Sequence, residues 1–231
     1  MIMAGGVGTR FWPMSRRNMP KQFLEIGGKA ILQHTIEAFV EACPGISVVT
    51  VLNSDYIGYW RDYCLRRNFT CPQIIVAGGF TRFHSVRNAL DKVPDGAIVA
   101  VHDGVRPLVT SRLVRDMFEK AETVQSLVPV IPCTDTLKVL QKEGEELKTV
   151  EGVVADRSML YAAQTPQIFH SEMLKSAYSL AYDTMFTDDA SVMQKYGKSL
   201  SYMIGERLNI KITTQEDLLL AEAVMSLRSK S

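Results

Sequence analysis

The stretch Ala4-Gly5-Gly6-Val7-Gly8-Thr9-Arg10, followed by Pro20-Lys21-Gln22-Phe23, decides how the chain begins to fold. Glycines directly after a first strand let the backbone approach an anion closely and direct N–H donors at it. The spacing has neither the G-K-[ST] of a P-loop nor the G-x-G-x-x-G of a dinucleotide-binding fold. Arg10 and Lys21 flank the glycines, and two cations beside such a loop suit a polyphosphate. The stretch predicts a phosphate-binding turn, with a plain tight turn bearing solvated charges as the alternative.

Strand-like and helix-like segments alternate along the rest of the chain. Apolar runs rich in β-branched residues at 46–52, 74–77 and 97–101 predict buried parallel strands. Apolar residues at three- and four-residue spacing predict helices over 31–40, 113–124 and 217–225. The alternation favours a single α/β domain over residues 1–231, with a mostly parallel, Rossmann-like sheet and helices on both faces.

Residues 133–158 interrupt this alternation. Segments 136–140 and 149–154 are apolar enough to pair, and the charged segment 141–148 lies between them. We therefore expect a long, protruding β-hairpin arm with its turn at 141–148. A lone hairpin would leave its apolar side chains in water, so the arm is expected either to be mobile or to pack against another chain. These side chains are Val139, Leu140, Val150, Val153 and Val154.

The composition excludes several classes of protein. The 231 residues carry 26 Lys and Arg against 25 Asp and Glu, a net charge of +1, which argues against a general nucleic-acid or membrane-surface binder. Apolar residues make up 46%, as in globular proteins, but no apolar run reaches the roughly 20 residues of a membrane helix. The four cysteines show no zinc-like spacing. We expect a soluble cytoplasmic protein without a signal peptide.

Polar residues follow the predicted strands where a ligand would bind. Asp103 comes after the strand at 97–101, and Gly78, Gly79 and Ser85 come after the strand at 74–77. Ligands of open α/β sheets bind outside the carboxyl ends of the strands. Position alone leaves Asp103 equally suited to hold Mg²⁺ with phosphates or to cap the next turn. Asp189 stands where it would cap a helix that starts at Ala190.

A series of motifs in a fixed order resembles the 2-C-methyl-D-erythritol 4-phosphate cytidylyltransferase family of nucleotidyltransferases. The resemblance starts with G-G-x-G-T-R and P-K-Q-F and continues to residue 217. The later motifs are Gly78-Gly-Phe-Thr-Arg-Phe-His-Ser85, Val101-His-Asp-Gly-Val-Arg-Pro107, Asp135-Thr-Leu-Lys138, Asp156-Arg157-Ser158, Gln164-Thr-Pro-Gln167, Thr187-Asp-Asp-Ala-Ser191 and Asn209-Ile-Lys-Ile-Thr213. It implies a glycosyltransferase-A-like fold. It also implies transfer of CMP from CTP to 2-C-methyl-D-erythritol 4-phosphate, a step of non-mevalonate isoprenoid biosynthesis.

The resemblance also implies the site residues, a divalent cation such as Mg²⁺, and a homodimer whose arms reach the partner's site. The expected catalytic cations are Arg10, Lys21 and Lys211, and the expected metal ligand is Asp103. The expected CTP-binding residues are Ala4, Gly5, Gly6, Gly8, Gly78, Gly79 and Ser85. The residues expected to bind the polyol phosphate are Thr136, Arg157, Arg106, Thr187 and Asp188.

Three alternative functions remain at this point. The stretch 11–19, which reads F-W-P-M-S-R-R-N-M, resembles the loop of mannose-1-phosphate guanylyltransferases, so a sugar-1-phosphate guanylyltransferase is one. A ribitol-5-phosphate cytidylyltransferase is another, although Lys138 and the run 156–158 favour methylerythritol phosphate. A non-catalytic nucleotide-binding module is the third, and the set of three cations with Asp103 argues against it, because a pure binding domain does not need transition-state cations.

Overall fold

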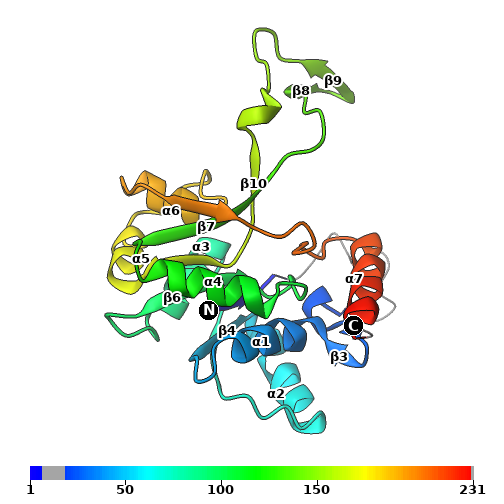
Figure 1. The fold of residues 1–231 in the computed structure, drawn as a ribbon, viewed down its shortest axis with the longest axis vertical. Coiled ribbons are helices and arrows are strands. Elements are labelled where there is room, and N and C mark those ends of the chain that lie inside the picture. Colours follow the sequence, from blue (N-terminus) through cyan, green and yellow to red (C-terminus); the bar gives the residue numbers. More distant parts are fainter. Residues whose placement is uncertain (7–18, 230–231) are drawn as a thin grey trace.

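The computed structural model describes residues 1–6 and 19–229, which form one body with a long projection (Figure 1). Eight strands make one mixed sheet in the order β10-β7-β11-β6-β1-β4-β5, and β12 pairs with β7. Its strands are β1 (Ile2–Ala4), β4 (Val48–Leu52), β5 (Gln73–Ala77), β6 (Ile98–Asp103), β7 (Ser126–Pro132), β10 (Tyr161–Ala163), β11 (Gln167–His170) and β12 (Ser201–Ile204). The neighbours β6, β1, β4 and β5 are parallel, and the antiparallel β11 joins them to β7. The predicted α/β class with a mostly parallel sheet is confirmed.

Helices cover both faces of the sheet, and β1 shows why. Ile2 and Ala4 point to one face, where they pack with α1 (Ile31–Ala42), α2 (Ile57–Arg66) and α4 (Ser111–Ala121). Met3, between them, points to the other face, where it packs with α3 (Arg82–Leu90), α5 (Ser171–Ala177) and α6 (Asp189–Lys195). Side chains alternate along a strand, so an unbroken apolar strand needs helices on both sides. The long helix α7 (Gln215–Arg228) lies at the edge of the body (Figure 1).

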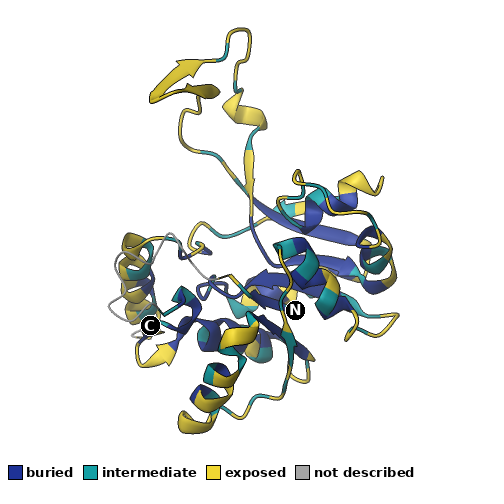
Figure 2. Ribbon diagram, turned by 180° about the vertical axis from the view of Figure 1, so that it is seen from behind, coloured by how far each residue is buried: buried dark blue, intermediate teal, exposed yellow. Residues whose placement is uncertain are grey.

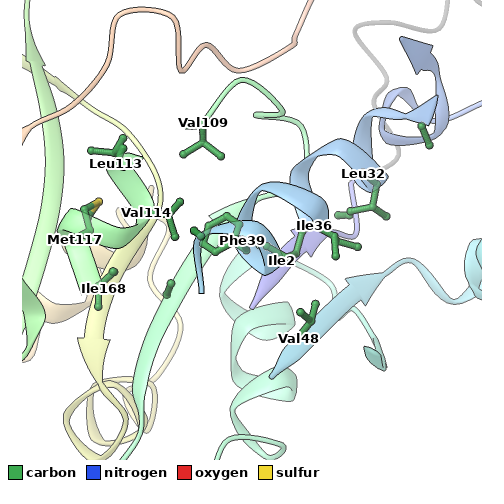
Figure 3. Close-up of a cluster of buried hydrophobic side chains, with 14 of the residues drawn as sticks. Ile2, Leu32, Ile36, Phe39, Val48, Val109, Leu113, Val114, Met117 and Ile168 are labelled. Carbon is green, nitrogen blue, oxygen red and sulfur yellow. The ribbon is translucent and has the colours of Figure 1, made fainter. Parts of the chain in front are cut away.

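The larger core lies between the sheet and the pair α1 and α4, whose apolar side chains meet over β1 (Figure 3). Leu32, Ile36 and Phe39 are spaced three and four residues apart and form the buried stripe of α1. Leu113, Val114 and Met117 form the matching stripe of α4. The helices expected over 31–40, 113–124 and 217–225 are confirmed, with α4 ending at Ala121.

One predicted strand differs in its surroundings. β5 follows the expected apolar run, but it is the edge strand next to β4, and Ile74 is 44% exposed. The expectation that this strand is buried on both faces is wrong, because an apolar run does not reveal which strand ends a sheet. β4 is buried throughout, as expected.

The arm protrudes from β7 and β10 (Figure 1), but its hairpin is not where the sequence pattern placed it. β8 (Leu140–Glu143) pairs with β9 (Glu146–Thr149) inside the segment expected to be the turn. The tight turn contains Gly144 at φ +63°, a conformation that glycine adopts at little cost. The expected strands at 136–140 and 149–154 are mostly irregular, because turn geometry sets hairpin register more strongly than charge does.

Three further features of the described residues complete the fold. None of their helices is both long enough and apolar enough to cross a membrane. The four cysteines Cys43, Cys64, Cys71 and Cys133 are free thiols of intermediate exposure. Two short antiparallel strands, β2 (Glu25–Ile26) and β3 (Lys29–Ala30), lead into α1.

Candidate active site

A cleft of about 500 Å³ opens at the carboxyl ends of β1, β5 and β6. Ala4 and Asp103 are the last residues of β1 and β6, and the turn after β5 supplies one wall. The lining residues are Met3, Ala4, Gly5, Gly6, Lys21, Gln22, Asn53, Gly79, Phe80, Thr81, Arg82, Ser85, Asp103, Val105, Lys211 and Thr213. The cleft therefore brings together most of the residues predicted to bind the nucleotide, from separate stretches of sequence.

Gln22 supports the start of the glycine turn. Its buried side-chain amide donates to the carbonyl oxygens of Ala4, at 2.8 Å, and of Gly6, at 3.0 Å. The short 3₁₀ helix Lys21–Phe23 carries Gln22 and places Lys21 in the lining of the cleft. The motif P-K-Q thus works as a unit in which one residue holds the turn and its neighbour provides a cation. Gly8 and Arg10, predicted to bind CTP and to act in catalysis, lie outside the described residues.

The turn after β5 is built for close approach of the backbone. The Gly78 N–H donates to the Leu52 carbonyl at 2.7 Å, and the Gly79 N–H donates to Ser85 Oγ at 3.0 Å. A Cβ at Gly79 would lie 2.5 Å from the Cβ of His84, and one at Gly78 would lie 3.1 Å from Ser85 Oγ. A side chain at Gly79 would displace α3, and one at Gly78 would need the Ser85 hydroxyl to shift by a few tenths of an ångström, so the turn favours glycine at both positions.

Asp103 is the electrostatic centre of the cleft. Its residue surface is 7% exposed, and three cations surround its carboxylate. Oδ2 lies 3.0 Å from Lys211 Nζ and 3.3 Å from Arg106 Nε, and Oδ1 lies 3.9 Å from Arg82 Nε. Burial raises the pKa of Asp103, but Lys211, Arg82 and Arg106 outweigh it and hold that pKa well below its usual range. Asp103 is therefore an anion at every physiological pH.

Lys211 reaches this centre from a distant part of the sequence. The neighbouring Ile212 is fully buried, and its N–H donates to the Val105 carbonyl at 2.9 Å. This bond fastens the segment at 210–213 beside the end of β6, while the Lys211 side chain stays 43% exposed and faces the cleft. The predicted placement of Lys211 with Lys21 and Asp103 in one site is observed.

Some predicted substrate residues lie elsewhere. Arg106 does not line the cleft. Its Nε lies 3.3 Å from Asp103 Oδ2, and its Nη1 donates to the Asn209 carbonyl at 2.7 Å. Asp188 caps α6 by accepting from the Ser191 N–H, and it also accepts from Gln167 Nε2 at 2.8 Å. Thr187 is exposed just before it.

Thr136 and Arg157 are exposed residues of the arm and do not line the cleft of their own chain. Arg157 Nη1 donates to the Thr134 carbonyl at 3.0 Å, which ties the two sides of the arm together near its base. Asp156 accepts from the Ser158 N–H and hydroxyl instead of pairing with Arg157.

Sequence reasoning missed one charged pair next to the cleft. Arg82, inside the motif at 78–85, lines the cleft and pairs with Asp189, which is fully buried. The expectation that Asp189 caps α6 is wrong, because Asp188 does so one residue earlier. The segment at 78–85 indicated a further role, because Arg82, its fifth residue, is not needed in a simple strand-to-helix turn.

His102, next to Asp103, is a structural residue. It is fully buried, and it shares a hydrogen bond with Thr165 Oγ1 at 3.1 Å and another with the Arg106 carbonyl at 3.2 Å. Burial lowers its pKa to about 3, so the ring is neutral at physiological pH. This matches the expectation that His102 serves local polar packing.

Comparison with known proteins agrees with this site. The family model described as IspD: 2-C-methyl-D-erythritol 4-phosphate cytidylyltransferase matches residues 1–227. Proteins of that name from Phocaeicola vulgatus and Azobacteroides pseudotrichonymphae are 40% and 41% identical, over 97% of this chain and 98% and 97% of theirs. The crystal structure of the Thermus thermophilus protein of that name has a TM-score of 0.72 at 29% identity, covering 98% of both chains.

The family match extends over nearly the whole chain, and the cleft lies where the family motifs converge: the glycine turns, the P-K-Q lysine, Asp103 and Lys211. The chain belongs to the 2-C-methyl-D-erythritol 4-phosphate cytidylyltransferase family.

Proposed function

We propose that this chain transfers CMP from CTP to 2-C-methyl-D-erythritol 4-phosphate. The products are 4-diphosphocytidyl-2-C-methyl-D-erythritol and pyrophosphate, in the non-mevalonate route to isoprenoid precursors. The observation that carries the proposal is the cleft in which Lys21, Lys211 and Asp103 meet two glycine turns, in a chain of this family. The described residues of the cleft include no nucleophilic Ser–His or Cys–His pair, which direct transfer between phosphates does not need.

The reaction needs alignment and charge neutralisation more than acid–base catalysis. An oxygen of the acceptor phosphate attacks the α-phosphorus of CTP, the bond from that phosphorus to the bridging oxygen breaks, and pyrophosphate leaves with the electron pair. The attacking oxygen is already an anion. Lys21 and Lys211, both in the lining, are placed to offset negative charge that shifts toward the leaving pyrophosphate. Their effect is expected mainly in the transition state.

The turn at 78–85 suits recognition of a small pyrimidine. Gly79, Thr81 and Ser85 line the cleft, and the absence of side chains at the glycines lets backbone groups come within hydrogen-bonding distance of a base edge. Such a turn suits cytosine, in keeping with the family.

Mg²⁺ fits the cleft as a partner of the triphosphate. The described residues contain no cluster of three or more His, Cys, Asp or Glu side chains that would hold a metal alone. Asp103 supplies one buried, ionised carboxylate, and Mg²⁺ is commonly held by one or two carboxylates together with substrate phosphates. When bound, the ion would neutralise the triphosphate and orient it for in-line attack. Lys211, now paired with Asp103, would be free to contact phosphate once the metal takes the carboxylate.

A homodimer joined through the arms completes the proposal. Leu147, Val153 and Val154 on the arm are 67%, 48% and 91% exposed in the single chain. Water-exposed apolar side chains on so thin a projection favour burial against a second copy. In such a dimer, Arg157 and Thr136 of one chain would reach the partner's cleft, where a guanidinium can grip the acceptor phosphate with two hydrogen bonds.

The test is pyrophosphate release with each of the four nucleoside triphosphates against each candidate acceptor. The acceptors are methylerythritol phosphate, ribitol 5-phosphate and mannose 1-phosphate. We expect turnover only with CTP and methylerythritol phosphate, and none in excess chelator. Turnover with a different pair would replace the proposed substrates, and binding of CTP without turnover would indicate a non-catalytic module. The variant Lys29→Ala removes a surface cation that pairs with Glu37, so it serves as the charge control for cleft variants.

A further inference from the structure

A buried carboxylate lies directly behind the cleft wall. Asp189, the first residue of α6, is 0% exposed. Its oxygens accept from Arg82 Nη1 at 2.9 Å, from Arg82 Nη2 at 2.6 Å and from the Tyr178 hydroxyl at 2.6 Å. Because Asp188 already caps the helix, capping does not explain Asp189.

The Arg82–Asp189 ion pair is better explained by its effect on the position of Arg82 than by a contribution to the stability of the fold. The cost of removing two charges from water offsets much of the attraction in a buried pair, so such pairs are weak evidence for a stabilising role. A two-point contact with a carboxylate does fix the plane and position of a guanidinium. Tyr178 is 2% exposed and stacks on Phe83, the residue after Arg82, so the carboxylate itself is firmly held.

The pairing with Asp189 limits how Arg82 approaches Asp103. With both Nη atoms engaged by Asp189, the Arg82 guanidinium turns only its Nε toward the cleft carboxylate, 3.9 Å from Oδ1. Lys211 and Arg106 approach the same carboxylate more closely, at 3.0 and 3.3 Å, but on Oδ2. Arg82 therefore adds positive potential to the cleft without closing onto Oδ1.

We propose that Asp189 is a positioning residue that holds Arg82 back from Asp103 and so keeps Asp103 accessible to the metal-bound triphosphate. The proposal rests on the proposed function. Without the Asp189 charge, Arg82 can move onto Oδ1 and compete with the bound metal. By Coulomb's law with an effective dielectric constant of about 20, an approach from 3.9 Å to about 3 Å changes an equilibrium constant about tenfold.

The test uses binding rather than turnover. Asp189→Asn keeps the shape and removes the charge, and the affinity for CTP with Mg²⁺ is measured by calorimetry on the full chain without acceptor. We expect about tenfold weaker binding at limiting Mg²⁺, recovering as Mg²⁺ is raised. The double variant Arg82→Gln with Asp189→Asn removes the competitor, so the Mg²⁺ concentration needed for half-maximal CTP binding is expected to return to about that of the unmodified chain.

A purely structural role predicts the opposite pattern. Loss of packing would lower the melting temperature and the active fraction, and Arg82→Gln would then add to the damage instead of reversing it. Unchanged affinity in Asp189→Asn, or a raised Mg²⁺ requirement that the double variant does not reverse, overturns the proposal. Asp95→Asn, which removes an exposed carboxylate paired with Lys175, is the matched control and should bind like the unmodified chain.

A milder variant keeps the proposal testable if Asp189→Asn does not fold. Tyr178→Phe removes one hydrogen bond to Asp189 and no charge, so it should weaken binding in the same direction by a smaller factor. Affinity equal to that of the unmodified chain would contradict the proposal. If the unmodified chain binds CTP with Mg²⁺ but does not transfer CMP, the proposed function fails while the role of Asp189 can still be tested by binding.

Discussion

The cleft and the arm differ in how many contacts their side chains make within one chain. At the cleft, a carboxylate that is 7% exposed has three cations within 4 Å from three separate segments, and hydrogen bonds fasten the turns around it. The hairpin of the arm is exposed along its whole length (Figure 2). Val154, farther along the arm, is 91% exposed. The comparison teaches that the described residues of the cleft are held by contacts within one chain, whereas the arm exposes apolar side chains that its own chain does not cover.

Removing a cleft cation should have the largest effect. Lys21→Ala and Lys211→Ala are expected to lower kcat by two to three orders of magnitude, about 3–4 kcal/mol, with a much smaller change in CTP affinity. The reason is that the charge they offset develops during transfer. Steady-state turnover at saturating CTP measures it, with Lys29→Ala as the control. The resemblance predicts the same for Arg10→Ala. Near-normal turnover of all three variants would contradict the assignment of the cleft as the active site.

The next effect concerns the metal. Asp103→Asn keeps the shape of the side chain and drops the charge, so it should raise the Mg²⁺ concentration for half-maximal activity by about tenfold or more. The measurement is a Mg²⁺ titration at fixed CTP. An unchanged midpoint would exclude Asp103 as a metal ligand, and activity of the unmodified chain in excess chelator would exclude a metal requirement altogether.

The same comparison shows what sequence could and could not predict. The glycine turns, Lys21 and Asp103 were predictable because the turns and the carboxylate each follow an apolar strand, and strand ends meet at one edge of a parallel sheet. The Arg82–Asp189 pair joins residues 107 positions apart, and no spacing rule connects them. Only the three-dimensional packing of α3 against α5 and α6 brings them together.

The sequence predicted that the arm exists, but it did not predict which residues pair in its hairpin. Its polar, weakly apolar sequence indicated a protruding hairpin. The position of the turn depends on Gly144 adopting a positive φ, and the neighbouring charged residues did not reveal that. The exposure of β5 was missed for a similar reason, because whether a strand ends a sheet depends on which strands pair, not on its own residues.

A charge on the arm should affect assembly and spare the cleft. Val154→Asp places a carboxylate on the exposed apolar surface of the arm proposed to contact the partner, once on each chain of a two-fold dimer. We expect the dimer to dissociate at least about tenfold more readily, with an unchanged melting temperature of the single chain. Sedimentation at several concentrations measures it, and Leu219→Asp, on the exposed face of α7, is the control. A chain that is monomeric before any substitution contradicts the dimer.

The last effect concerns the stability of the chain in mild acid. Burial lowers the pKa of His102 to about 3, whereas the ordinary value in the unfolded chain is 6.5. The unfolded state therefore binds a proton that the folded state excludes. The His102 contribution is fully present above pH 6.5 and is lost as the pH falls toward 3, by up to about 1.4 kcal/mol per pH unit. Urea unfolding between about pH 7 and pH 5 should show a shallower dependence of stability on pH in His102→Gln than in His84→Gln. Equal slopes would mean that another group controls acid stability.

The most direct test of the proposed dimer is whether the arm of one chain completes the cleft of the other. Arg157→Ala should raise the KM for methylerythritol phosphate and leave CTP binding nearly unchanged, because Arg157 lies outside its own cleft. Lys21→Ala and Arg157→Ala chains with different tags are co-expressed, and the purified heterodimer is assayed at acceptor concentrations where each homodimer is nearly inactive. One site then has an intact Lys21 from its own chain and an intact Arg157 from the partner, so about half of the unmodified activity is expected. No recovery in a verified heterodimer would contradict a shared site.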